Sequence, residues 1–183
     1  MKAALLVNGL PASGKTSVAR AVTTRTGWPL LTLDSIKEPF FDQLGIGDRD
    51  FNRALGRGAY HAIWSIIADG PDCLHVVIDA WFWLEPLEVL RRSLALAGVT
   101  HVAEAWCEAP PEVLAERYVG RAGQRHAGHP GVEYATELMT KALTAHPLGI
   151  FPLIRVDSTR PLDVDALMRF VATHLGAPPT AAL

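Results

Sequence analysis

The chain has 183 residues, of which 49% are hydrophobic and 20% charged, and its formal net charge is −2 at pH 7. These values fit one soluble domain with a full hydrophobic core. The near-neutral charge argues against a broad surface for nucleic acid or membranes, so we expect neither as a partner. The apolar run 3–7 is too short for a signal peptide, and no run reaches membrane-spanning length. Cys73 and Cys107 are expected to be buried, reduced thiols, which together with these features predicts a cytoplasmic protein.

Short apolar runs alternate with helical patterns along the chain. This alternation predicts a single α/β domain, residues 1–183, in which a five-stranded parallel sheet carries helices on both faces. The predicted strands are residues 3–7, 30–33, 74–78, 101–106 and 153–156. The predicted helices cover residues 14–26, 35–44, 50–68, 87–97, 111–119, 133–145 and 163–175, with Asp50 as the N-cap of the third. The tail, residues 176–183, is predicted to be disordered.

Residues 9–16 read GLPASGKT and match the phosphate-binding loop pattern G-x-x-x-x-G-K-[ST]. The two glycines let the backbone curl around an anion, so that backbone N–H groups point inward. Lys15 would reach the β- and γ-phosphates, and the Thr16 hydroxyl would hold Mg²⁺. A strand precedes the loop and a helix follows it, as this mechanism requires. We therefore expect ATP and Mg²⁺ as cofactors, with nucleotide contacts from Gly9, Pro11, Ala12, Ser13, Gly14, Lys15, Thr16 and Ser17.

Two aspartates follow predicted strands, where ligands of open α/β sheets lie. Asp79 ends an apolar strand and is the expected second Mg²⁺ residue; the alternative is a helix cap. Asp34 follows the second strand and is positioned to accept the proton of an attacking hydroxyl; the alternative is again an N-cap, for a helix starting at Ser35. The residues alone leave open which of the two acids is the base.

Arg117, Arg121 and Arg125 are spaced four residues apart, so a continuous helix would place them on one face. Like charges at this spacing repel, and contact with phosphate would explain the stripe better than solvent alone. Glycines nearby would let residues 117–145 move as an Arg-rich lid. The alternative is a solvated basic face.

The acceptor side of the expected site is less defined. Trp81, Phe82 and Trp83 follow Asp79, and either fill the core or line the acceptor pocket. The acids Asp34, Asp42 and Glu85 would suit a cationic acceptor. His126, His129 and His146 lack the compact spacing of a metal site and are expected to be surface or lid residues.

The chain resembles the chloramphenicol phosphotransferase-like P-loop kinases. The segments that carry the resemblance are VNG and SGKT within 7–16, LDSI at 33–36, FNRAL at 51–55, VVID at 76–79 with Phe82, Arg121 with Arg125, and VDST at 156–159. The resemblance implies ATP-dependent phosphorylation of a small-molecule hydroxyl, with Asp34 as general base. It also implies that Arg121 and Arg125 are lid arginines and that Asp157 and Arg160 bracket a loop contacting adenine.

The sequence departs from that family at Ala80, where a second aspartate would stand, and in the stretch after Asp34. Chloramphenicol is therefore not supported as the substrate. The sequence predicts a small-molecule kinase in which Lys15, Asp34, Arg121 and Arg125 are catalytic and Arg117 also contacts the nucleotide. Two alternatives are a toxin-type kinase acting on a nucleotide-sugar or an RNA end, and a nucleotide-binding regulator without transfer activity. The oligomeric state is left undetermined.

Overall fold

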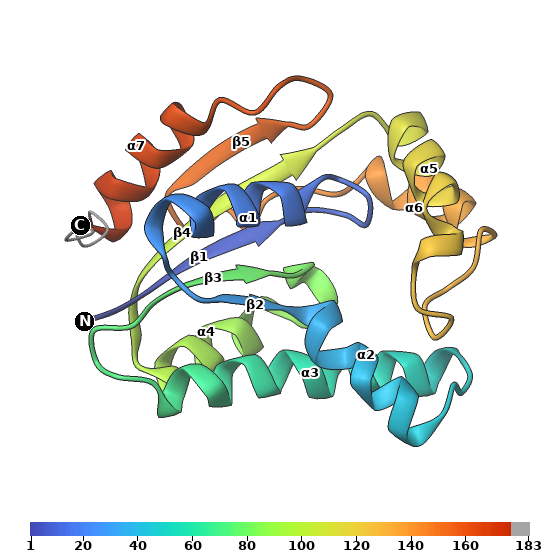
Figure 1. Cartoon of the computed structure of the whole chain (residues 1–183), viewed down its shortest axis with the longest axis horizontal. Coiled ribbons are helices and arrows are strands. Elements are labelled where there is room, and N and C mark those ends of the chain that lie inside the picture. Colours follow the sequence, from blue (N-terminus) through green and yellow to red (C-terminus); the bar gives the residue numbers. More distant parts are fainter. Residues whose placement is uncertain (177–183) are drawn as a thin grey trace.

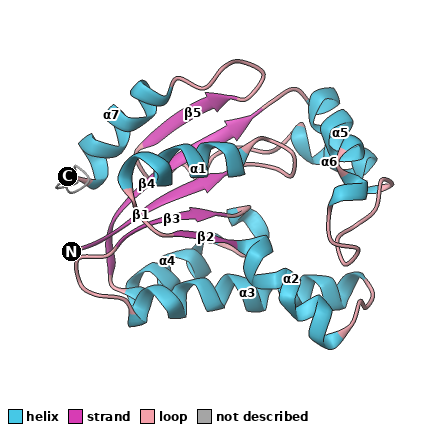
Figure 2. Ribbon diagram, in the orientation of Figure 1, coloured by secondary structure: helices cyan, strands magenta, loops and turns pink. Residues whose placement is uncertain are grey.

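A parallel β-sheet lies at the centre of the computed structural model, which describes residues 1–176 (Figures 1 and 2). Within these residues the sheet has five strands in the order β2-β3-β1-β4-β5, as predicted: β1 (Lys2–Asn8), β2 (Leu30–Thr32), β3 (His75–Asp79), β4 (Val99–Glu108) and β5 (Leu153–Asp157). The α-helices are α1 (Lys15–Thr26), α2 (Leu33–Leu44), α3 (Arg49–Asp69), α4 (Leu87–Ala97), α5 (Pro111–Gly120), α6 (Tyr134–Ala142) and α7 (Val164–Leu175). Two short 3₁₀ helices are η1 (Phe82–Leu84) and η2 (Ala122–Gln124). Of the tail predicted to be disordered, residues 177–183 lie outside the described part.

Strand β1 is fully buried because helices cover both faces of the sheet. Its alternate residues point in opposite directions, as the two-residue period of a strand requires. Ala3, Leu5 and Val7 pack with α1 and α7, whereas Ala4 and Leu6 pack with α3 and α4. Figure 1 shows these helix pairs on either side of the sheet. This double burial explains why β1 is a continuous apolar run rather than an alternating one.

The order of the strands fixes where a ligand can bind. Strand β1 lies between β3 and β4, and the chain reaches β2 and β3 on one side of β1 before it crosses to β4 and β5 on the other. At such a switch point the connections leave in opposite directions and open a crevice at the carboxyl ends of the strands. The residues that follow β1 and β3 face this crevice.

Two local features differ from the prediction at the start of helices. Thr32 ends β2 and caps α2, because its Oγ1 accepts a hydrogen bond from the backbone N–H of Ser35 at 3.0 Å. Asp34 therefore lies in the first turn of α2 rather than at a strand tip or at an N-cap. The N-cap of α3 is Asp48, which accepts from the backbone N–H of Phe51 at 2.9 Å, so the assignment of Asp50 was wrong.

The region predicted as a lid consists of α5, η2 and α6. Helix α5 ends at Gly120, and α6 is shorter than the predicted helix over residues 133–145. Between them the chain approaches α2 from the opposite side of the crevice (Figure 1). Of the two cysteines, Cys107 is buried but Cys73 is exposed, contrary to expectation. Among the helices of residues 1–176, none has the length and apolar character needed to cross a bilayer.

Candidate active site

The loop at residues 9–16 joins β1 to α1, and three of its residues have positive φ angles, which residues other than glycine rarely adopt. Gly9, Ala12 and Gly14 have φ angles of 143°, 67° and 85°. A Cβ on Gly9 would collide with the carbonyl oxygen of Cys107 and lie 2.6 Å from the Oγ of Ser13. The close approach of β4 therefore requires glycine at position 9, and the positive φ favours glycine at positions 9 and 14.

The side chains of the loop fit an anion. Lys15 Nζ donates to the carbonyl oxygen of Leu10 at 2.9 Å, so the ammonium lies across its own loop. Burial lowers the pKa of Lys15, and the nearby Asp79 carboxylate opposes this effect. The Oγ of Ser13 is buried and has no hydrogen-bond partner among the described residues. A partly buried ammonium and a buried hydroxyl without a partner in residues 1–176, both in a tightly curved loop, are what a phosphate group needs.

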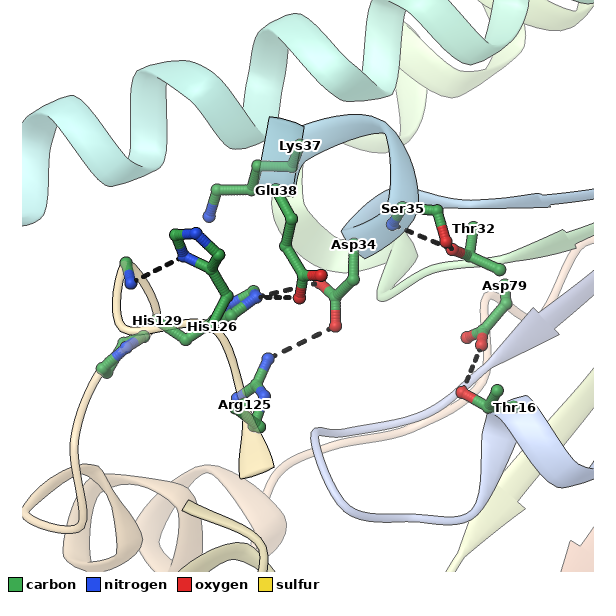
Figure 3. A network of polar contacts seen from close by, with 12 residues as sticks. Thr16, Thr32, Asp34, Ser35, Lys37, Glu38, Asp79, Arg125, His126 and His129 are labelled. Carbon is green, nitrogen blue, oxygen red and sulfur yellow. Dashed lines mark hydrogen bonds and ion pairs between the residues drawn. The ribbon is translucent and has the colours of Figure 1, made fainter. Parts of the chain in front are cut away.

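Thr16 and Asp79 form the second part of this end of the crevice. Thr16 Oγ1 donates to Asp79 Oδ2 at 2.6 Å, from the first turn of α1 to the end of β3 (Figure 3). Asp79 is only 7% exposed. A hydroxyl and a carboxylate are hard oxygen ligands of the kind that Mg²⁺ prefers. These two residues therefore fit a magnesium ion beside the phosphate loop.

A buried pair that the sequence analysis missed holds the start of the loop. Asn8 Oδ1 accepts from the backbone N–H groups of Gly9 at 2.8 Å and Phe82 at 3.1 Å. Asn8 Nδ2 donates to Glu104 Oε1 at 2.8 Å, and Glu104 also accepts from the backbone N–H of Leu148. Burial raises the pKa of Glu104. An acid inside the apolar strand β4 is the sequence signal that points to this pair.

The first turn of α2 carries Asp34 toward the same crevice from the opposite side. Asp34, Glu38 and Asp42 recur every four residues, so they share one face of α2. Each pairs with a basic side chain of the loop that follows η2, and Figure 3 shows Asp34 and Glu38 with their partners. The pairs are Asp34 Oδ2 with Arg125 Nη2 at 3.3 Å, Glu38 Oε1 with His129 Nε2 at 2.8 Å, and Asp42 Oδ1 with His126 Nε2 at 3.0 Å.

The loop that follows η2 is docked on α2 and α3 by packing as well as by charge. A Cβ on Gly128 would lie 2.5 Å from the ring of Phe41, so the loop backbone lies directly on that ring. Asn52 Nδ2 of α3 donates to the carbonyl oxygen of Gly128. The side chain of His129 is 5% exposed, and this burial lowers its pKa. These contacts place the predicted lid against α2, which carries Asp34, and against α3.

The three arginines of the predicted stripe lie in different environments, because α5 ends before the second of them. Arg117 donates from Nη1 to Ser158 Oγ at 2.8 Å and from Nη2 to Ser158 O at 2.9 Å. Arg121 follows the helix end, faces the cavity, and has a buried Nε without a hydrogen-bond partner in residues 1–176. Arg125 instead lies beside Asp34. The helix does not continue past Gly120, so the condition for one shared helical face is not met.

The loop after β5 lies beside Arg117. Asp157 Oδ1 accepts from the Thr159 hydroxyl at 2.6 Å and from the Thr159 backbone N–H at 2.9 Å, and these bonds lower the pKa of Asp157. Arg160 Nε lies 3.2 Å from Asp157 Oδ2. Asp157 and Thr159 line a cavity of about 370 Å³ that also contacts Leu10 of the phosphate loop. Asp157 thus lies at the outer edge of the phosphate loop, whereas the Arg160 side chain is mostly exposed.

A larger cavity, of about 980 Å³, joins the two ends of the crevice. Trp81 lines it, whereas Phe82 is buried in the core and Trp83 Nε1 donates to the carbonyl oxygen of His146 outside it. Arg117, Asp157 and Arg160 are not part of its wall. The sequence-predicted residues that it brings together are Pro11, Lys15, Thr16, Asp34, Asp79, Arg121 and Arg125.

Comparison with known proteins agrees with this geometry. Residues 5–146 match the AAA domain family. The chain belongs to this family. A candidate kinase from Chloroflexus aurantiacus has a structure that is similar over 95% of this chain and 98% of its own, with a TM-score of 0.78 and 29% identity. The chain thus has an α/β fold of the P-loop kinase type.

Two more distant structures share the fold. A gluconokinase from Sinorhizobium meliloti matches with a TM-score of 0.59 and 21% identity, over 93% of this chain and 90% of its own. A sugar kinase from Janibacter matches with the same TM-score and 18% identity, over 97% of this chain and 95% of its own. None of the curated protein sequences matches this chain.

Proposed function

We propose that this protein is an ATP-dependent kinase that transfers the γ-phosphate to a hydroxyl group of a small molecule, such as a sugar, an amino sugar or an antibiotic alcohol. One observation carries the proposal: the phosphate-loop residue Lys15, the Thr16–Asp79 pair and the Asp34 carboxylate line one cavity. The names of the structural neighbours, a candidate kinase, a gluconokinase and a sugar kinase, support this reaction class.

In this proposal the phosphate end acts by charge. Residues 9–16 enclose the phosphates, and Lys15 neutralises oxygens of the β- and γ-phosphates. Thr16 and Asp79 would hold Mg²⁺, which when bound neutralises further charge on the phosphates. Arg121 has a buried Nε–H without a partner among the described residues, and in this proposal it neutralises charge on the phosphoryl group that is transferred. The residues of this end supply positioning and electrostatic stabilisation rather than covalent chemistry.

At the acceptor end, Asp34 is the general base. Its carboxylate accepts the proton of the acceptor hydroxyl while the hydroxyl oxygen forms a bond to the γ-phosphorus. The bond from that phosphorus to the bridging oxygen breaks, and ADP leaves. Arg125 donates to the Asp34 carboxylate in the free protein. When the acceptor hydroxyl contacts that carboxylate instead, Arg125 would contact the phosphoryl group. The resemblance to chloramphenicol phosphotransferase-like kinases supports this assignment of Asp34 over Asp79, which is already held by Thr16.

The remaining assignments concern the nucleoside and the moving parts. Residues 117–145 form the lid, and the loop from Asp157 to Arg160 contacts adenine together with Arg117. The bidentate contact of Arg117 with Ser158 supports this, because it places a planar guanidinium beside the loop where a base can stack.

The proposal is tested with a library of metabolites and antibiotics incubated with magnesium and ATP. We expect ADP formation that depends on one class of hydroxyl compound, and a product whose mass is that of the compound plus one phosphate group. Binding of ATP without phosphorylation of any compound, or hydrolysis of ATP to the same extent with and without acceptors, would refute transfer and favour a nucleotide-dependent regulator.

A further inference from the structure

Lys37 is a buried cation whose position the proposed transfer reaction does not explain. It lies one turn after Asp34 on α2, is 7% exposed, and lines the large cavity. Its Nζ donates to Asn52 Oδ1 of α3, and the ring of Phe41 lies 5.1 Å from Nζ. Figure 3 shows the Lys37 side chain extending from α2 toward the docked loop.

The ammonium of Lys37 has fewer partners than its charge demands. An ammonium group has three N–H donors, and the amide of Asn52 takes one of them. Within residues 1–176 no carboxylate lies within 4.0 Å of its Nζ, since no ion pair of Lys37 is formed there. Burial lowers the pKa of Lys37, although the charge of Asp34 one turn away opposes this effect. A buried charge without a counterion is expensive, and an anion that binds beside it removes that penalty.

The acids around the cavity cannot serve as this counterion because they are engaged elsewhere. Asp34 pairs with Arg125 at 3.3 Å, and Glu137 pairs with Arg49 at 2.6 Å and with Lys141 at 2.9 Å. The acids from which a cationic acceptor was expected are likewise paired: Asp42 with His126, and Glu85 with Arg57 at 3.9 Å. Glu38, the residue after Lys37, contacts His129 Nε2 at 2.8 Å instead, so Lys37 has no carboxylate partner within 4.0 Å among residues 1–176.

We propose that Lys37 binds an anionic group, a carboxylate or a phosphate, of the acceptor whose hydroxyl faces Asp34. This assignment rests on the proposed kinase function. The acceptor is thus a small hydroxylated acid, or a phosphorylated polyol, and Lys37 determines the specificity for it.

The test uses pairs of related compounds, one with an anionic group and one without it. D-gluconate with D-glucitol and D-glycerate with glycerol test the carboxylate, and ribose 5-phosphate with ribose tests the phosphate. For wild-type protein with ATP and magnesium we expect the charged member of at least one pair to have the higher kcat/KM. Lys37→Met should lower that kcat/KM by about 30-fold or more, the scale for leaving one partner of a buried ion pair alone. Lys37→Arg, which keeps the charge, should recover part of the preference.

The controls separate a specificity role from a structural one. Lys141→Met removes an ammonium from the same cavity, but one that is paired with Glu137, and should leave the ratio of kcat/KM within each pair unchanged. The affinity of Lys37→Met for magnesium and the ATP analogue AMP-PNP should equal that of wild type. Equal turnover of charged and neutral members, or a preference that survives Lys37→Met, would overturn the assignment.

Binding without transfer distinguishes the two proposals. The same compounds are titrated calorimetrically into protein saturated with magnesium and AMP-PNP. Charged compounds that bind wild type and not Lys37→Met, but that are never phosphorylated, would support the anion site and refute the kinase function. If no charged compound of any pair binds or is turned over, the anion assignment is wrong.

Discussion

The two ends of the cavity are built in different ways. At the phosphate end, Lys15 contacts Leu10 only five residues away, and the backbone conformation is set by glycines within the loop. At the acceptor end, Asp34 meets Arg125 across 91 residues of sequence, and Asn52 meets Gly128 across 76. The phosphate loop is a contiguous segment that Asp79 of β3 and Glu104 of β4 support through Thr16 and Asn8, whereas the acceptor end consists of segments that only the fold brings together.

This difference explains what each end can do. A loop whose shape is set locally presents the same N–H groups to any triphosphate, so it provides chemistry that is independent of the acceptor. An end assembled from α2, α3 and the docked loop changes shape whenever the loop moves. We therefore propose that specificity and closure belong to the acceptor end. The following substitutions test this division, beginning with the largest expected effect.

Replacing Lys15 by methionine should disable the phosphate end. Loss of the charge that faces the β- and γ-phosphates should lower kcat by about 10³-fold, the upper range for one stabilising group, and should weaken ATP binding. Turnover is measured as ADP formation, and affinity by calorimetric titration of AMP-PNP. Turnover within tenfold of wild type would mean that the loop does not bind the transferred group. The contrast with Lys37→Met, which should keep nucleotide affinity, sharpens the division between the two ends.

Asp34→Asn should damage the acceptor end alone. We expect kcat to fall by about 10²-fold or more, the usual scale for losing a general base, with nucleotide affinity unchanged. The matched control is Asp42→Asn, which alters another carboxylate on the same face of α2 and one that pairs with His126. If both variants lose the same activity, Asp34 acts by docking the loop and not as the base.

Gly9→Ala tests whether the loop geometry depends on local backbone freedom. The added Cβ would collide with the carbonyl oxygen of Cys107 at a φ of 143°, so we expect a loss of about 2 kcal/mol in the free energy of unfolding and weaker nucleotide binding. Gly123→Ala is the control, because a Cβ there meets no atom within 4 Å and its φ is not positive. Urea unfolding of both variants measures the difference. Equal stability of the two variants would show that the loop can adjust.

The smallest expected effect is the pH dependence of the docked loop. His129 is held neutral by burial, with Asp34, Glu38, Lys37 and Arg125 around it, so its pKa is lower in the folded protein than in the unfolded chain. Below about pH 6.5 the unfolded chain takes up the proton first, and stability is lost as the pH falls further. Urea unfolding between pH 7.5 and 5 should show a steeper decline for wild type than for His129→Gln. Parallel curves would contradict the burial of a neutral His129.

The difference between local and long-range contacts also limits what the sequence predicts. The strand pattern predicted the five-stranded parallel sheet, and the motif at residues 9–16 predicted the loop, because both depend on residues close together in sequence. The pairing of Asn8 with Glu104, the choice of Asp48 over Asp50 as a cap, and the partners of Asp34 were not predicted. The two pairings depend on side chains that the fold brings together from distant segments, and the cap depends on local backbone geometry; periodicity encodes neither. A shared face of the three arginines requires a helix that continues to residue 125, whereas α5 ends at Gly120, close to the predicted end at residue 119.

A crystal structure of the protein with magnesium and AMP-PNP would show both ends of the cavity at once. We expect the β- and γ-phosphates to lie within residues 9–16, Lys15 Nζ to leave the carbonyl of Leu10 for the phosphate oxygens, and the Asp34 carboxylate to face the γ-phosphate across the cavity. A nucleotide bound elsewhere, or Asp34 directed away from the terminal phosphate, would contradict this expectation.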